Sequence, residues 1–139
     1  MDANSVDYSY IANEESYRPD QVIIEEGSVG KWTCVILEGQ VKIRKKIDKR
    51  TVDIATLKEG AVFGETTIFQ TDEARRPLSV VADGPVSVGV LDNRRLHEDW
   101  ASVSPQLRRL MSTLIERLEK TTTKAAQMLA QRAQESTNK

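Results

Sequence analysis

Between residues 17 and 92 the sequence is a series of short apolar runs, rich in β-branched residues and each closed by Gly, Pro or Asp. The runs read VIIEEG, WTCVILEGQVKI, TVDIATLKEG, LSVVADG and VSVGVLD. In the last of them Val86, Val88 and Val90 fall on one face of an extended chain. Several short strands with turn residues between them predict a small antiparallel β-barrel or sandwich, and therefore a mainly β domain.

The sequence becomes helical in character after Asp92, which is a good N-cap residue. Ser104 and Pro105 give a second helix start, with serine at the cap and proline at the first helical position. An apolar stripe at alternating spacings of three and four residues follows, and then weakens: Leu107, Met111, Leu114, Leu118, Thr121, Ala125 and Met128. Two interpretations stay open, since the stripe can pack on the barrel or pair with a second copy as a short coiled coil. The last residues are expected to be frayed and solvated.

The composition indicates one soluble domain of 139 residues with a formal net charge of −1, which gives no electrostatic reason to expect nucleic acid binding. The basic run at 42–50 is interpreted as a solvated edge strand and hairpin. Cys34 is the single cysteine and is expected to be buried and inert. Neither a signal peptide nor a membrane-spanning run is visible, so a cytoplasmic location without membrane attachment is expected.

Enzymatic chemistry has little support in the sequence. His97 is the one histidine, so neither a histidine-rich metal site nor more than one catalytic histidine can form. There is no G-x-S-x-G motif and no phosphate loop of the G-x-x-x-x-G-K-[ST] type. We therefore predict no catalytic residue, no metal and no cofactor.

The stretch FGETTIFQTDEARRPLSVVA, residues 63–82, has the parts of a phosphate pocket. A glycine followed by a short helical turn offers unpaired backbone N–H groups and the positive end of a dipole. Arg75 or Arg76 can close over the phosphate with two donors. Glu65 would repel a phosphate, but it can accept a hydrogen bond from the 2′-OH of a ribose. A phosphate next to a ribose hydroxyl indicates a nucleotide.

This stretch resembles the phosphate-binding cassette of the cyclic-nucleotide-binding domains, in which F-G-E is followed by an arginine and a β-strand. The resemblance extends over about 17–118, from QVIIEEGSVGKWTCVILEGQVKI to the two helices. Residues 1–16 are then an irregular or short helical lead-in, and residues 119–139 are a helix extension with a frayed tail. It implies a jelly roll (a double-stranded β-helix) followed by C-terminal helices. It also implies that the helix from Pro105 moves over the base. The implied ligand-binding residues are Gly64 and Glu65 at the ribose, Thr66 and Thr67 at the phosphate, Arg75 or Arg76 at the phosphate, and Ser79 near the phosphate or base.

The chain departs from the family pattern at the arginine pair. Counting back from SVVA selects Arg76, whereas counting forward from FGE selects Arg75. If Arg76 holds the phosphate, Pro77 removes an amide N–H that the family usually offers. No threonine directly follows the arginine to contact a guanine, which weakly favours cAMP over cGMP. The alternative is a domain of the same fold that binds no nucleotide and acts as a protein-interaction module.

The output of the module is expected to involve protein contacts. The family's bacterial DNA-binding members carry a helix-turn-helix after the long helix, and the residues after Leu118 are too few for one, so no DNA partner is expected. The chain is interpreted as a stand-alone regulatory module of bacterial type. Its partners are a cyclic nucleotide and either another protein or a second copy of itself through the C-terminal helix.

Overall fold

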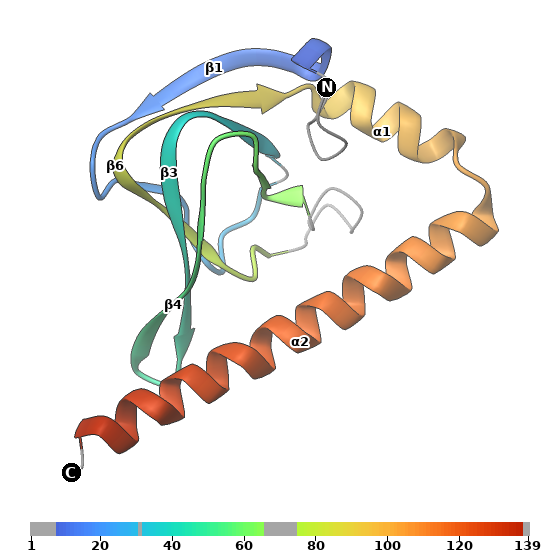
Figure 1. Cartoon of the computed structure of the whole chain (residues 1–139). Helices are drawn as coiled ribbons and strands as arrows, with labels where there is room; N and C mark the ends of the chain where they lie inside the picture. The colour runs from blue at the N-terminus through green and yellow to red at the C-terminus, as the bar shows by residue number, and fades with distance from the viewer. Residues whose placement is uncertain (1–7, 31, 66–74, 138–139) are drawn as a thin grey trace.

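A computed structural model describes residues 8–30, 32–65 and 75–137 of the chain (Figure 1). A curved antiparallel sheet forms the N-terminal part, and two helices follow it. The elements are η1 (Tyr8–Tyr10), β1 (Ile11–Tyr17), β2 (Val22–Ile24), β3 (Cys34–Ile47), β4 (Arg50–Leu57), β5 (Val62–Phe63), β6 (Ser79–Leu91), α1 (Asn93–Ser102) and α2 (Pro105–Thr137).

The two long strands β3 and β6 organise the sheet, whose order is β1-β6-β3-β4. β6 pairs with β2 near its start and with β1 toward its end, while β3 pairs first with β5 and then with β4. Because each long strand changes partner along its length, the sheet curls on itself. This is the mainly β, jelly-roll architecture with C-terminal helices that the sequence predicted.

Gly39 lies within β3 at a point where the pairing with β6 shifts register, between Glu38 and Gln40. Its φ of +87° suits glycine, and a Cβ here would lie 2.3 Å from the Pro85 carbonyl oxygen. A side chain at this position would therefore force the two long strands apart.

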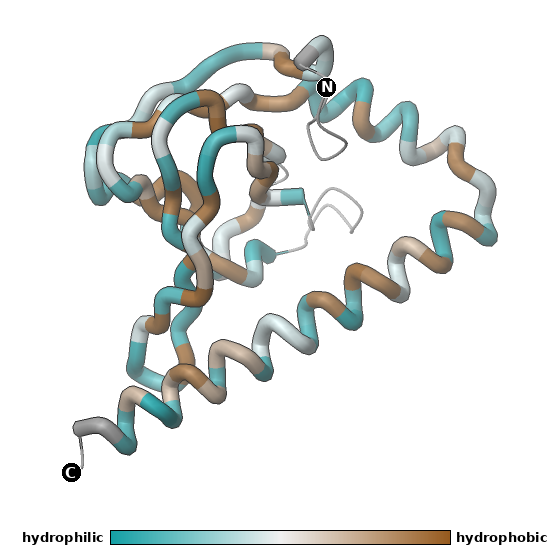
Figure 2. Tube along the Cα trace, viewed as in Figure 1, coloured by the Kyte–Doolittle hydropathy of each residue, from teal (hydrophilic) through white to brown (hydrophobic). Residues whose placement is uncertain are grey.

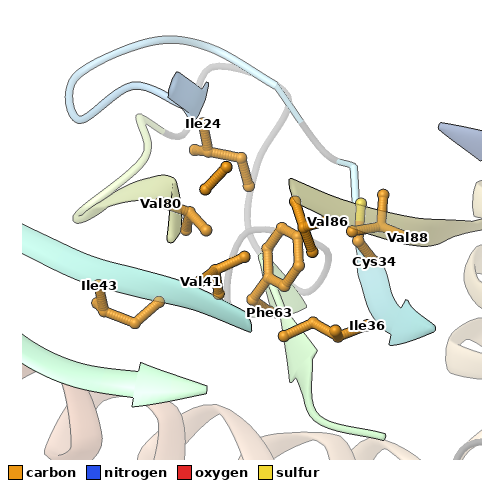
Figure 3. Close-up of a cluster of buried hydrophobic side chains, with 10 residues drawn as sticks. Ile24, Cys34, Ile36, Val41, Ile43, Phe63, Val80, Val86 and Val88 are labelled. Atoms are coloured by element: carbon orange, nitrogen blue, oxygen red, sulfur yellow. The ribbon is translucent and has the colours of Figure 1, made fainter. Parts of the chain in front are cut away.

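The core lies inside the curl of the sheet (Figure 3). Val86 and Val88 of β6 are 3% and 0% exposed, as their alternation predicted. Cys34 is buried and free, and burial raises the pKa of its thiol to about 11, so the expected buried thiol is confirmed. The buried cluster consists of Ile24, Cys34, Ile36, Val41, Ile43, Phe63, Val80, Ala82, Val86 and Val88.

Two expectations about strands were wrong. The lead-in before Tyr17 was expected to be irregular or helical, but it contains β1, which pairs with β6. The basic segment 42–50 was expected to be a solvated edge strand and hairpin; the hairpin is observed, with Ile47 paired to Arg50, but residues 42–47 belong to β3, which lies between β6 and β4. One basic residue there, Lys45, has a side chain only 15% exposed. The alternation rule places every second residue of β3 on the inner face, whatever its charge.

Both helices begin where the sequence predicted. Asp92 caps α1 by accepting from the backbone N–H groups of Arg94 and Arg95, at 3.0 and 3.4 Å. The hydroxyl of Ser104 accepts from the Leu107 N–H at 3.2 Å at the start of α2. α2 then continues through the segment that was expected to weaken and fray, and ends at Thr137.

α2 contacts the barrel through a face different from the predicted apolar stripe. The helix runs beneath the sheet and contacts β4 and β3, with Ala126 and Ala130 buried (Figure 1). Hydrophobic positions recur along the length of the helix, interleaved with hydrophilic ones (Figure 2). Leu107 and Leu114 are 49% and 62% exposed, so this part of the stripe does not pack on the barrel, whereas Leu118, which is 54% exposed, lies at the cavity between α2 and the barrel. No helix among the described residues is both long enough and apolar enough to cross a membrane.

Candidate ligand-binding site

A cavity of about 160 Å³ lies between the inner face of the barrel and α2. Its barrel wall is mostly apolar and includes Ile24, Ile43, Leu57, Val62, Phe63 and Val80. The described polar residues around it are Lys45, Glu65 and Arg76 of the barrel and Glu119, Thr122 and Thr123 of α2. An apolar cleft with a few convergent polar groups is typical of a small-molecule site.

Arg76 is the most deeply buried charged residue at the cavity, with 5% of its surface exposed. Its guanidinium donates to the Gly64 carbonyl at 3.0 Å and to the Trp32 carbonyl at 2.8 Å. Its backbone is also fixed, because its N–H donates to Ser28 and its carbonyl accepts from Gly27, both at 2.8 Å. Burial lowers the pKa of Arg76, while Cys34 and Glu65 act in the opposite direction. The guanidinium stays charged near neutral pH, so this end of the cavity attracts an anion.

Gly64 allows this arrangement because it has no side chain. Its φ is +80°, and a Cβ would lie 2.4 Å from the Trp32 carbonyl oxygen and 3.0 Å from a guanidinium nitrogen of Arg76. Its carbonyl accepts from Arg76 and, at 3.4 Å, from the Thr33 hydroxyl. The backbone therefore approaches the arginine closely.

Glu65 lies beside this glycine and lines the same cavity. Burial raises the pKa of its carboxyl, while a backbone hydrogen bond and the charge of Arg76 lower it. The residue is nevertheless exposed, so solvent screens these effects on its pKa. A carboxylate in this position can accept a hydrogen bond from a ligand hydroxyl.

The two adjacent arginines lie in different surroundings. Arg75 is exposed, forms an isolated bridge with Val29 and donates to the Gly27 carbonyl at 2.8 Å. It is absent from the described lining of the cavity, whereas Arg76 and the following Pro77 belong to it. The structure therefore places Arg76 at the cavity, together with Pro77, the proline that lacks an N–H.

Of the other predicted site residues, the structure describes only Ser79, and it does not bring Ser79 to the cavity. Ser79 begins β6, and its hydroxyl accepts from the Glu26 N–H at 2.9 Å; it is missing from the described cavity lining. Its expected place near a phosphate or base is therefore not observed. Thr66 and Thr67 lie outside the described residues, so their expected role at a phosphate stays a prediction.

The sequence interpretation missed Lys45 and the polar residues of α2. Lys45 donates to the Pro77 carbonyl at 3.0 Å and lies 3.6 Å from a carboxylate oxygen of Glu26. The available signal was its alternation with Val41 and Ile43 along β3. For α2 the signal was the helical spacing between Glu119, Thr122 and Thr123 and the buried Ala126.

The barrel and the cavity together define a ligand-binding module with a cationic end. Comparison with protein families identifies the class of module more specifically. The cyclic nucleotide-binding domain model matches residues 14–98, so the chain belongs to that family. The human cyclic nucleotide-gated channel beta-1 is 34% identical over 83 residues, which cover 59% of this chain and 7% of the channel.

Solved structures agree with this assignment. The EAL enzyme Bd1971 in its cAMP-bound form superposes with a TM-score of 0.74 at 25% identity and covers 91% of this chain. The cGMP-bound form of the same enzyme gives a TM-score of 0.71 at 28% identity over 77% of this chain. The chain spans 33% and 28% of those two structures, and a far smaller share of the channel. It is thus similar to one domain of larger proteins.

Proposed function

We propose that this chain is a regulatory module that binds a cyclic purine nucleotide in the cavity between the barrel and α2. The buried Arg76 guanidinium, held by two carbonyls at the edge of the cavity, carries the proposal. A cyclic phosphodiester would offset the cost of burying this cation. Glu65 would accept a hydrogen bond from the ribose 2′-OH. The family assignment and the neighbours solved with cAMP and cGMP support the same ligand class.

The helix α2 is the element that would transmit binding. Four of its residues, Leu118, Glu119, Thr122 and Thr123, line the cavity opposite the barrel. A nucleotide anchored at Arg76 therefore meets α2 with its other end. If the ligand contacts one placement of α2 better than another, binding shifts the population of the helix toward that placement.

Isothermal titration of the folded protein tests the binding proposal. We expect cAMP or cGMP to bind with micromolar affinity. Linear 5′-AMP and 5′-GMP should bind at least about tenfold more weakly, because a dianionic monoester brings a second negative charge to a single buried guanidinium. Absence of heat with both cyclic nucleotides would contradict the proposal. That result would favour the alternative, a domain of the same fold that acts through protein contacts alone.

We further propose that the exposed stripe on α2 pairs with a second copy of the chain. Leucine side chains recur there in heptad spacing, and a run of exposed leucines on one helix face is typical of a partner surface. The exposed apolar residues on this stripe and directly beside it are Leu107, Leu110, Leu114, Leu118 and Met128, at 49%, 63%, 62%, 54% and 63% exposure.

The charges beside the stripe favour a parallel pair. In a parallel coiled coil Arg117 of one copy lies opposite Thr122 of the other, and Lys124 lies opposite Leu129. In an antiparallel pair centred between Lys120 and Thr121, Arg117 would lie opposite Lys124 on both sides, and like charges would repel. The parallel arrangement avoids this repulsion.

Replacing Leu114 with glutamate should weaken the dimer. The residue belongs to the stripe and is absent from the described cavity lining, so two buried leucines would be lost without a change at the ligand site. At about 1.5–3 kcal/mol for each leucine, the dimer dissociation constant should rise more than about 100-fold. Sedimentation equilibrium measures this. Thr113→Glu, which adds the same charge at the neighbouring exposed position, is the control and should stay dimeric. Two outcomes would refute the pairing. One is a wild-type chain that is still monomeric at 100 times the concentration used in the sedimentation experiment, and the other is an equal effect of both variants.

A further inference from the structure

Lys45 is a buried cation that the phosphate site does not use. It lies on the inner face of β3 among apolar neighbours of the cavity wall, where Ile43 precedes it by two residues. Its side chain is 15% exposed, and that of its ion-pair partner Glu26 is 23% exposed. A lysine is rarely this buried unless it is paired. The pairing with Glu26 and Pro77 lowers the cost of burial, but it does not explain why a charged residue stands at the wall of the cavity.

The ammonium group retains donor capacity toward the cavity. Lysine carries three N–H donors. Among the described residues one is directed to the Pro77 carbonyl at 3.0 Å, and a second can serve Glu26 at 3.6 Å. These two contacts also fix the position of Nζ, so the group acts as a placed donor rather than a flexible surface charge.

The position of Lys45 relative to Arg76 determines which part of a nucleotide it can meet. The guanidinium of Arg76 is directed to Trp32 and Gly64, beside the strand pair of Phe63 with Cys34 at the start of β3. Lys45 lies toward the other end of β3, where it pairs with Val52 of β4, the strand that α2 contacts. A nucleotide whose phosphate is bound by Arg76 would extend its base toward this end of the cavity.

We propose that Lys45 contacts the purine base and favours guanine over adenine, an inference that rests on the proposed nucleotide binding. Guanine presents two adjacent acceptors, O6 and N7, whereas adenine presents N7 beside an N6 amino donor. An ammonium group can donate only, so it matches the guanine edge and opposes the adenine amino group. The polar residues Glu119, Thr122 and Thr123 line the same cavity from α2.

The test compares the ratio of the cAMP and cGMP dissociation constants in the wild type and in Lys45→Met. We expect the substitution to weaken cGMP binding about tenfold or more and to leave cAMP binding unchanged or slightly tighter. Cyclic IMP carries O6 and N7 but lacks the 2-amino group, so it should follow cGMP. Cyclic IMP therefore distinguishes a contact of Lys45 with O6 and N7 from a contact with the 2-amino group of guanine. Lys45→Gln, which keeps a polar side chain and a donor, should give an intermediate ratio.

Arg44→Gln is the matched control. It removes one positive charge from the neighbouring residue of the same strand, but Arg44 pairs with Asp53 at 2.6 Å and is absent from the described cavity lining. Its ratio should equal that of the wild type. If Lys45→Met binds nucleotide with the same ratio of cAMP and cGMP dissociation constants as the wild type, the role of Lys45 is overturned and the proposed function is not. Absence of binding by the wild type would overturn the proposed function instead.

Discussion

Replacing Arg76 with glutamine should weaken cyclic-nucleotide binding by at least about 100-fold, while Arg75→Gln should change it less than about threefold. Arg76 is 5% exposed at the cavity, and its planar group can give two hydrogen bonds to a phosphodiester. Each hydrogen bond to a charged group contributes about 1.5–3 kcal/mol, so losing two reaches the expected factor. Arg75 is exposed and directed to the Gly27 carbonyl. Calorimetric titration of both variants measures the difference.

A third variant separates the charge of Arg76 from its geometry. Arg76→Lys keeps a cation but loses the planar pair of donors, so its affinity should lie between those of the wild type and Arg76→Gln. Because Arg76 also bonds to the Gly64 and Trp32 carbonyls, the melting temperature of each variant is needed beside its affinity. Equal loss of binding at Arg75 and Arg76 in folded proteins would refute the assignment of the anion site to Arg76.

The strands and helix starts could be predicted because they depend on local chemistry. The alternation of Val86 and Val88 and the cap at Asp92 follow from one short stretch of sequence each, and both are observed. Which of the two arginines lines the cavity could not be decided in this way. It depends on how Arg75 aligns with Val29, a pairing between residues far apart in the sequence. A shift of one residue exchanges the inner and outer faces of the chain.

The orientation of α2 shows a second limit of sequence periodicity. The most apolar stripe of the helix was the natural candidate for the barrel contact, yet the buried residues are Ala126 and Ala130. Small side chains let a helix backbone approach strands closely, and this steric requirement carries no strong hydrophobic signal. The same limit hid Lys45, whose charge indicated solvent although its place in the alternation of β3 indicated the interior.

Replacing Gly64 with alanine should damage both stability and binding, whereas Gly60→Ala should affect stability alone. Both glycines have a positive φ, +80° and +86°, so either alanine costs about 1–2 kcal/mol of backbone strain. A Cβ at Gly60 would meet no described atom within 4 Å. A Cβ at Gly64 would lie 2.4 Å from the Trp32 carbonyl oxygen and 3.0 Å from a nitrogen of Arg76.

The additional effect at Gly64 follows from what must move. The Trp32 carbonyl accepts a bond from Arg76 at 2.8 Å, so relieving the clash displaces the carbonyl, the guanidinium or both. We expect a further loss of about 1–3 kcal/mol in the free energy of unfolding, measured by urea denaturation. Nucleotide affinity should fall at least about tenfold in Gly64→Ala and remain unchanged in Gly60→Ala. If the two variants lose equal stability and both retain wild-type affinity, the close contact between Gly64 and Arg76 has no part in forming the anion site.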